Sequence, residues 1–214
     1  SLVVVLAMLV GGVVWGVPWL SRELAYQLPV ALEQRAGQEG LDTMDRLWTS
    51  PSTLSEERQQ ALLQLMQPAL LALQQRHPDH RLNVHFRASE ALGANAFALP
   101  GGKIGVYTGI LKVAENQDQL GAIIGHEVGH VLERHSNERL SSSQASQMGL
   151  SLVNVILESQ NIESRNTVMA GLGLGVQYGV LMPYGRSHES EADIVGQDLM
   201  AKSGFDPKAS IKLW

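Results

Sequence analysis

The stretch QDQLGAIIGHEVGHVLERH, residues 117–135, predicts a buried helix that carries a small polar cluster. Its apolar residues recur at helical spacing, at Leu120, Ile123, Ile124, Val128, Val131 and Leu132. Gly125 and Gly129 leave room for the close approach of a neighbouring element. We therefore expect this helix to lie in the core against another element.

His126, Glu127 and His130 are the main polar residues of this helix. Two histidines four residues apart lie about 40° apart around a helix axis, so His126 and His130 can direct their rings at one metal ion. Glu127 is rotated by about 100° from His126, where it can take a proton from a metal-bound water. A metal also offsets the cost of burying these groups unpaired, about 1–3 kcal/mol each. The alternative is two core histidines bonded to the backbone, with Glu127 in an ion pair.

A catalytic zinc has three protein ligands and one open position, so a third ligand must come from elsewhere. The chain has no cysteine, and its densest downstream polar cluster is RSHESEAD, residues 186–193. Glu189 and Asp193 share one face of a predicted helix, whereas Glu191 points about 200° away from Glu189 and is expected to face solvent. We predict that Glu189 binds zinc and that Asp193 accepts the N–H of a zinc-bound imidazole. Without the upstream motif, an acidic helix N-terminus would explain this cluster.

With these residues, the chain resembles the M48 family of zinc metallopeptidases, in its bacterial and mitochondrial quality-control branch. The similarity is good over residues 80–214 and loose over residues 1–79. Its segments are NAFALPGGKIGVYTGIL at 95–111, HEVGHVLERHSNER at 126–139, GRSHESEAD at 185–193 and SGFDP at 203–207.

The resemblance implies a gluzincin-like fold and an endopeptidase that uses one Zn²⁺ per chain. Zinc is then bound by His126, His130 and Glu189, and Glu127 is the general base. The resemblance also implies that an edge strand holds the substrate backbone by strand addition, through Asn95, Ala96, Phe97, Ala98 and Leu99. In such enzymes a group beyond the second motif often stabilises the oxyanion. Within this chain the nearest candidates for that role, or for hydrogen bonding to a zinc ligand, are Arg186, His188 and His135.

The remaining pattern predicts an α+β fold, mainly helical and zincin-like, with a small edge-stranded sheet. A helix should follow the capping-box pair Thr53 and Glu56. Strands are predicted at residues 81–87, 95–99 and 103–107, the last two flanking a Pro-Gly-Gly turn. Further helices are predicted at residues 109–114, 139–160, 165–182 and 187–203.

Residues 1–20 contain no charged side chain and as a helix would span roughly 30 Å, the thickness of a bilayer's hydrocarbon core. We predict a transmembrane anchor rather than a cleavable signal peptide, because Pro18, Trp19 and Leu20 do not resemble a small-residue cleavage site. Residues 21–52 are predicted as a connector. Residues 53–214 are predicted as the metallopeptidase domain, cut short at its C-terminal end. The resemblance suggests a single-pass protein of the bacterial inner membrane with its catalytic domain in the periplasm.

The formal net charge of −5 and the scattered Lys and Arg residues offer no basic surface for nucleic acid. The predicted function is peptide-bond hydrolysis by a zinc-bound water that Glu127 activates, and the resemblance suggests misfolded or membrane-associated proteins as substrates. The predicted partners are protein or peptide substrates and, through residues 1–20, the lipid bilayer. Two alternatives stay open: a metallated but autoinhibited chaperone or assembly factor, and a zinc enzyme acting on a non-peptide bond. The sequence predicts no oligomeric state.

Overall fold

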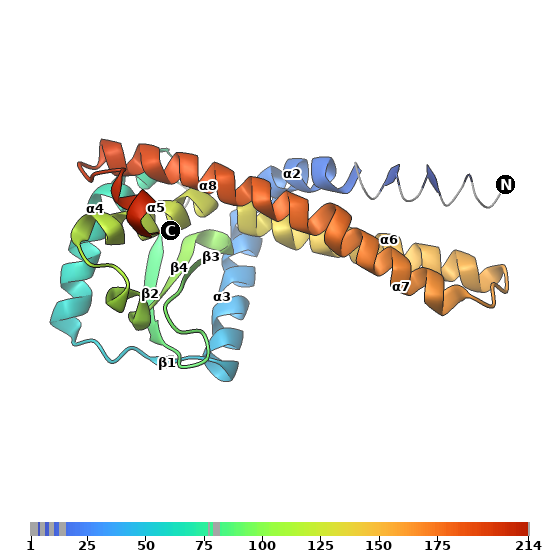
Figure 1. Ribbon diagram of the computed structural model, residues 1–214, viewed down its shortest axis with the longest axis horizontal. Coiled ribbons are helices and arrows are strands. Elements are labelled where there is room, and N and C mark those ends of the chain that lie inside the picture. Colours follow the sequence, from blue (N-terminus) through green and yellow to red (C-terminus); the bar gives the residue numbers. More distant parts are fainter. Residues whose placement is uncertain are drawn as a thin grey trace. The chain divides into compact units, whose positions relative to one another are not determined.

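A computed structural model of the chain describes residues 4, 7–8, 11–12, 16–76, 78 and 82–213. These residues form a mainly helical α+β structure with one four-stranded sheet, as predicted (Figure 1). The chain divides into two compact units. Unit 1 comprises Ser1–Leu28 and Asn137–His188, and unit 2 comprises Pro29–Ser136 and Glu189–Trp214. Each unit is described by itself below.

Unit 1 is built from helices. It contains α2 (Val17–Gln27), most of α6 (His135–Ser159), α7 (Arg165–Val176), the π-helical turn η4 (Gln177–Leu181) and the start of α8 (Met182–Lys202). Its buried apolar residues include Ala25, Val153, Leu157 and Val176. The helices predicted at 139–160, 165–182 and 187–203 are thus present, with shifted ends.

Unit 2 holds the sheet and the helices around it. Its elements are α3 (Val30–Leu47), β1 (Ser50–Pro51), α4 (Glu56–Arg76), β2 (Asn83–Ala88), β3 (Ala96–Leu99), η2 (Pro100–Gly102), β4 (Lys103–Tyr107), η3 (Thr108–Lys112), α5 (Gln117–Leu132) and α9 (Ala209–Leu213), together with the end of α8. The three predicted strands are present as β2, β3 and β4 with slightly different ends, and residue 81 of the first prediction lies outside the described residues. The short β1 was not predicted, because two exposed residues carry no pattern.

The sheet has the strand order β1-β2-β4-β3, in which β2 and β4 are parallel and β3 pairs antiparallel with β4. In the sheet formed by the described residues, β3 is therefore an edge strand. The apolar residues of β2 and β4 pack against α4 and α5 in one core, which includes Leu62, Phe86, Ile104, Val106, Ile124 and Val128. This core fixes α5 against the sheet, and α5 carries the predicted metal ligands.

The segment 21–52, predicted as a connector, contains most of α2 and all of α3. Gly37 and Gly40 both lie inside α3. A methyl group on Gly37 would overlap the carbonyl oxygen of Pro100, so this glycine allows α3 to approach η2 closely. Near its end, α3 is bound to β2 by a two-pronged ion pair, with Arg87 Nε 2.8 Å from Asp45 Oδ1 and Arg87 Nη2 2.9 Å from Asp45 Oδ2.

The predicted membrane segment, residues 1–20, lies partly outside the described residues. Among the residues that are described, no helix combines the length and the apolar character that a bilayer crossing requires. The transmembrane part of the fold prediction is therefore not supported by the structure.

Candidate metal centre

The helix α5 places His126 and His130 side by side. Asn116 caps this helix, with its Oδ1 accepting the N–H of Gln119 at 2.9 Å. The two histidines are one turn apart, and their Nε2 atoms lie 3.1 Å from each other. Both side chains are largely buried, with exposed fractions of 12% for His126 and 5% for His130. The shared face predicted from the sequence is thus present in the structure.

The end of α8 crosses α5 at a contact between small residues. A methyl group on Gly129 would lie 2.8 Å from the carbonyl oxygen of Ala192, and one on Gly196 would lie 2.8 Å from the backbone nitrogen of His126. Gly125 is as confined, because its methyl group would lie 3.0 Å from the carbonyl oxygen of Gly196. The prediction that Gly125 and Gly129 admit a neighbouring element is confirmed. The close crossing brings the acidic residues of α8 to the histidines.

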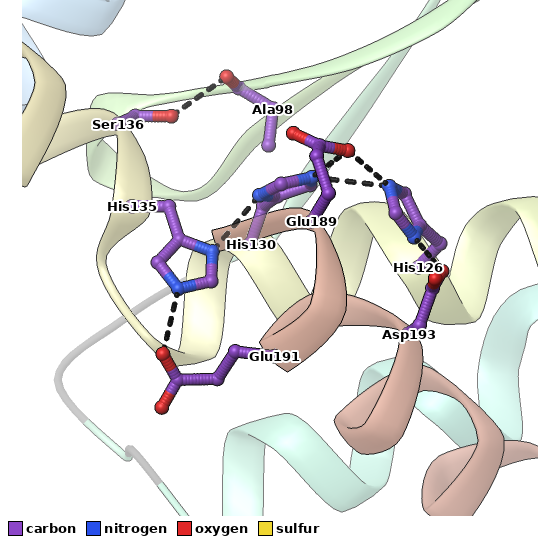
Figure 2. A network of polar contacts seen from close by, with 8 residues as sticks. All are labelled: Ala98, His126, His130, His135, Ser136, Glu189, Glu191 and Asp193. Atoms are coloured by element: carbon purple, nitrogen blue, oxygen red, sulfur yellow. Dashed lines mark hydrogen bonds and ion pairs between the residues drawn. The ribbon is translucent and has the colours of Figure 1, made fainter. Parts of the chain in front are cut away.

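Glu189 completes a triangle of possible ligand atoms (Figure 2). Its Oε2 lies 3.2 Å from His126 Nε2 and 3.5 Å from His130 Nε2. Zinc bonds of 2.0–2.2 Å in a tetrahedron give ligand separations of about 3.3–3.6 Å. The three separations here are close to that range, and two imidazoles with one carboxylate are a donor set typical of catalytic zinc. These residues therefore fit a zinc ion.

Asp193 contacts the other ring nitrogen of His126. Its Oδ1 lies 2.8 Å from His126 Nδ1, where a carboxylate accepts the N–H of the imidazole (Figure 2). That bond holds the proton on Nδ1 and leaves the lone pair of Nε2 directed at the ligand triangle. Asp193 therefore lies beside His126, and its role toward a zinc-bound imidazole stays a prediction.

A second chain of contacts runs through His135, one of the three candidates for hydrogen bonding to a zinc ligand, and on to Glu191, which was not predicted to take part. His135 Nδ1 lies 2.9 Å from His130 Nδ1, and His135 Nε2 lies 3.4 Å from Glu191 Oε2 (Figure 2). Glu191 was expected to face solvent, but its side chain is 39% exposed and turned toward His135. The angular argument compared Glu191 only with Glu189 on the same helix, whereas its partner His135 is the first residue of α6. The spacing of five residues between His130 and His135 was a signal, although an ambiguous one.

Glu127 faces a cavity of about 120 Å³ whose other walls are mostly apolar. The cavity is lined by Ala94, Asn95, Ala96, Ile110, Val113, Ile123 and Glu127. Glu127 is buried, and the cavity joins it to the beginning of the edge strand β3. A second cavity of about 170 Å³ is lined by residues that include His126, Asp193 and Gly196.

The register of β3 decides which of its backbone groups face outward. Tyr107 donates its N–H to the Asn95 carbonyl, so the alternation of an antiparallel pair turns the groups of Ala96 and Ala98 away from β4. The Ala98 carbonyl accepts a hydrogen bond from the Ser136 hydroxyl at 2.8 Å. The Ala96 N–H is bonded to Asn95 Oδ1 at 3.0 Å. In the described part of the chain, the Ala96 carbonyl and the Ala98 N–H are thus the outward groups left for a bound strand.

The other two candidates, Arg186 and His188, belong to unit 1. His188 is buried, and its Nε2 lies 2.9 Å from Glu138 Oε2, which is also buried. The contact with Glu138 accounts for the burial of His188 within unit 1. Arg186 is exposed. His135, by contrast, lies in contact with the predicted ligand His130.

The fold and the triangle of possible ligand atoms are typical of metallopeptidases of the HExxH class. The sequence model of peptidase family M48 matches residues 55–214, and the chain belongs to this family, as predicted. It is 37% identical over 120 residues to the mitochondrial metalloendopeptidase OMA1 of Schizosaccharomyces pombe, covering 56% of this chain and 33% of the relative. It is 29% identical over 119 residues to the β-barrel assembly-enhancing protease of Escherichia coli K12, covering 54% of this chain and 24% of the relative. The matches thus span at most about a third of these relatives' lengths.

Proposed function

We propose that this chain is a zinc endopeptidase whose ion is held by His126, His130 and Glu189. The observation that carries the proposal is the triangle of His126 Nε2, His130 Nε2 and Glu189 Oε2, with separations of 3.1, 3.2 and 3.5 Å. The membership of family M48 supports the same conclusion. Zinc bound there would acidify a coordinated water and polarise the scissile carbonyl.

In this proposal Glu127 is the general base. It follows His126 directly on α5, and its carboxylate is buried at the wall of a cavity. It accepts a proton from the attacking water and later passes that proton to the leaving amine. Asp193 keeps the His126 ring in the tautomer that presents Nε2 to the ion.

The substrate would lie along β3 as an added strand. The Ala96 carbonyl and the Ala98 N–H face away from β4, and they can bond to the backbone of an extended peptide. One substrate side chain would enter the cavity beside Glu127, whose walls include Ile110, Val113 and Ile123. An apolar side chain suits these walls, so we expect cleavage next to apolar residues.

The test is casein cleavage by the zinc-loaded chain and by its Glu127→Gln variant. The variant should bind one zinc and lose nearly all activity, because an amide cannot accept the proton. Glu115→Gln is the matched control, since Glu115 is an exposed glutamate that precedes α5, and it should retain full activity. Unchanged cleavage by Glu127→Gln would refute the role of Glu127. A zinc-loaded parent that cleaves nothing would contradict the proposed function and favour the assembly-factor alternative.

We further propose misfolded or membrane-associated proteins of the bacterial envelope as substrates. One of the relatives is named as a β-barrel assembly-enhancing protease, which supports this class. The absence of charge from residues 1–20 supports anchoring at the inner membrane through that segment. Extraction of membranes at alkaline pH should leave the chain in the pellet and release a form that begins at residue 21. Release of both forms would refute the anchor.

A further inference from the structure

His130 is in contact with a second imidazole on the side away from the ligand triangle. Its Nδ1 lies 2.9 Å from His135 Nδ1, and the His135 side chain is only 1% exposed. The remaining nitrogen of His135, Nε2, lies 3.4 Å from Glu191 Oε2. Figure 2 shows the three side chains in a row, from His130 through His135 to Glu191.

Only one arrangement of protons fits this row together with metal binding at His130. If His130 Nε2 gives its lone pair to a metal, the neutral ring carries its proton on Nδ1. His130 then donates to His135 Nδ1, so His135 must carry its own proton on Nε2. That proton points to the Glu191 carboxylate, which can only accept. Each donor thereby faces an acceptor, and the last acceptor is the negatively charged carboxylate of Glu191.

We propose that His135 and Glu191 are positioning residues that fix the tautomer and the ring orientation of His130 for zinc. The inference rests on the zinc site proposed above. His126 has a carboxylate partner directly, through Asp193, whereas His130 has one through an intervening imidazole. Both histidine ligands are thereby held in the form that binds a cation.

The backbone around His135 supports such a role. Arg134 has a φ of 55°, in the left-handed region that non-glycine residues rarely adopt, and this turn ends α5 and begins α6 at His135. Arg134 Nη1 also lies 3.3 Å from the buried Glu33 Oε1. On the other side, Ser136 is bonded to the Ala98 carbonyl of β3. His135 is therefore held between two anchored neighbours.

The first test measures the zinc dissociation constant of Glu191→Ala by competition with a chromophoric chelator. Glu191 is partly exposed, so its removal should leave the fold intact. We expect zinc binding to weaken by about tenfold, in the range reported for partners of metal ligands. Asp198→Ala is the matched control, because it removes from the same helix a carboxylate that pairs with Lys202. This variant should bind zinc as the parent does.

The second test separates the hydrogen bond from simple packing. His135→Asn places an oxygen near the position of Nδ1 and should retain part of the affinity, whereas His135→Leu should lose about 10–100-fold. Because Glu191 acts through His135, adding Glu191→Ala to His135→Leu should cause no further loss. Equal zinc affinities of the Asn and Leu variants would contradict a hydrogen-bonding role.

The third test reads the protons directly. In ¹⁵N-histidine NMR spectra of the zinc-loaded chain, His135 should show a protonated Nε2 and an unprotonated Nδ1. Glu191→Ala should lower the population of that tautomer. The opposite tautomer, or a parent-like zinc affinity of Glu191→Ala, would overturn the inference and leave the zinc site standing. A parent chain that binds no zinc would overturn both.

Discussion

Asp193 affects the site through a single hydrogen bond, to His126 Nδ1. We predict that Asp193→Ala weakens zinc binding by about 10–100-fold, because the ring of His126 loses its fixed tautomer and orientation. Chelator competition measures the change. An affinity within twofold of the parent would show that the bond has no effect on the ligand.

At the scale of residues, the sequence predicted what one helix determines by itself. His126, Glu127 and His130 are close in the chain, and helical geometry fixes their relative directions. Glu189 and Asp193 could be paired with them because they share a face of α8. The contact between His135 and Glu191 depends on the left-handed Arg134 and on the rotation of α8 about its axis, and neither has a local signature.

The crossing of α5 and α8 depends on glycines at the scale of elements. We predict that Gly196→Ala destabilises the chain and weakens zinc binding, because the new methyl group would lie 2.8 Å from the His126 nitrogen and push the helices apart. Urea unfolding and chelator competition measure the two effects. Gly185→Ala is the control on the same helix, where a methyl group meets nothing within 4 Å. It should stabilise by about 0.5–1 kcal/mol, since alanine is the better helix former.

If both variants proved equally stable and bound zinc equally, the close approach of α5 and α8 would not be what brings Glu189 and Asp193 to the histidines.

The sheet contains a histidine whose burial makes stability depend on pH. Burial lowers the pKa of His85 below its usual 6.5, and the positive charges of Arg87 and Lys103 lower this pKa further. The unfolded chain therefore takes up this proton more readily, and stability should fall as the pH drops below about 6.5. We predict that His85→Gln reduces the loss of stability between about pH 7.5 and about pH 5.5. Urea unfolding of the zinc-free parent and variant measures this difference, because the titratable groups that the two proteins share contribute equally to both.

An equal loss of stability in both proteins would rule out His85 as the source.

The ion pair between Asp45 of α3 and Arg87 of β2 affects stability at a lower pH. The hydrogen bond from Arg87 lowers the pKa of Asp45 below 3.8. The ion pair therefore stabilises the folded chain near neutral pH, and this stabilisation is lost only as the pH falls through the lowered pKa.

Several helices were predicted from the spacing of their apolar residues, whereas the pairing of strands, which depends on distant contacts, was not. The helices around 117–135 and 139–160 follow from the spacing of their apolar residues. The helix α3 was missed although its apolar residues recur at helical spacing, and its Gly37 allows a close approach to Pro100. β2 and β4 pair in parallel although β3 lies between them in the sequence, and the alternation of residues in a strand does not specify its partner.

At the scale of the whole molecule, zinc binding should appear as stability. A ligand present at 100 times its dissociation constant stabilises the folded chain by about 2.7 kcal/mol. For a chain of this size that corresponds to a rise of about 5–10 °C in Tm. We predict this rise for the parent and for Glu127→Gln in scanning calorimetry, and its absence for His126→Ala. A Tm of the parent that does not respond to zinc would contradict a specific site.

The chain's membership of family M48 leaves its own activity to be measured, since its matches span at most about a third of the curated relatives' lengths. The most direct measurement is a zinc titration of the chelator-stripped chain, with casein cleavage as the readout. Cleavage should start near zero, rise linearly to one equivalent of zinc and then stay constant. Full cleavage by the zinc-free chain, or none after one equivalent has bound, would contradict the proposal of a zinc endopeptidase.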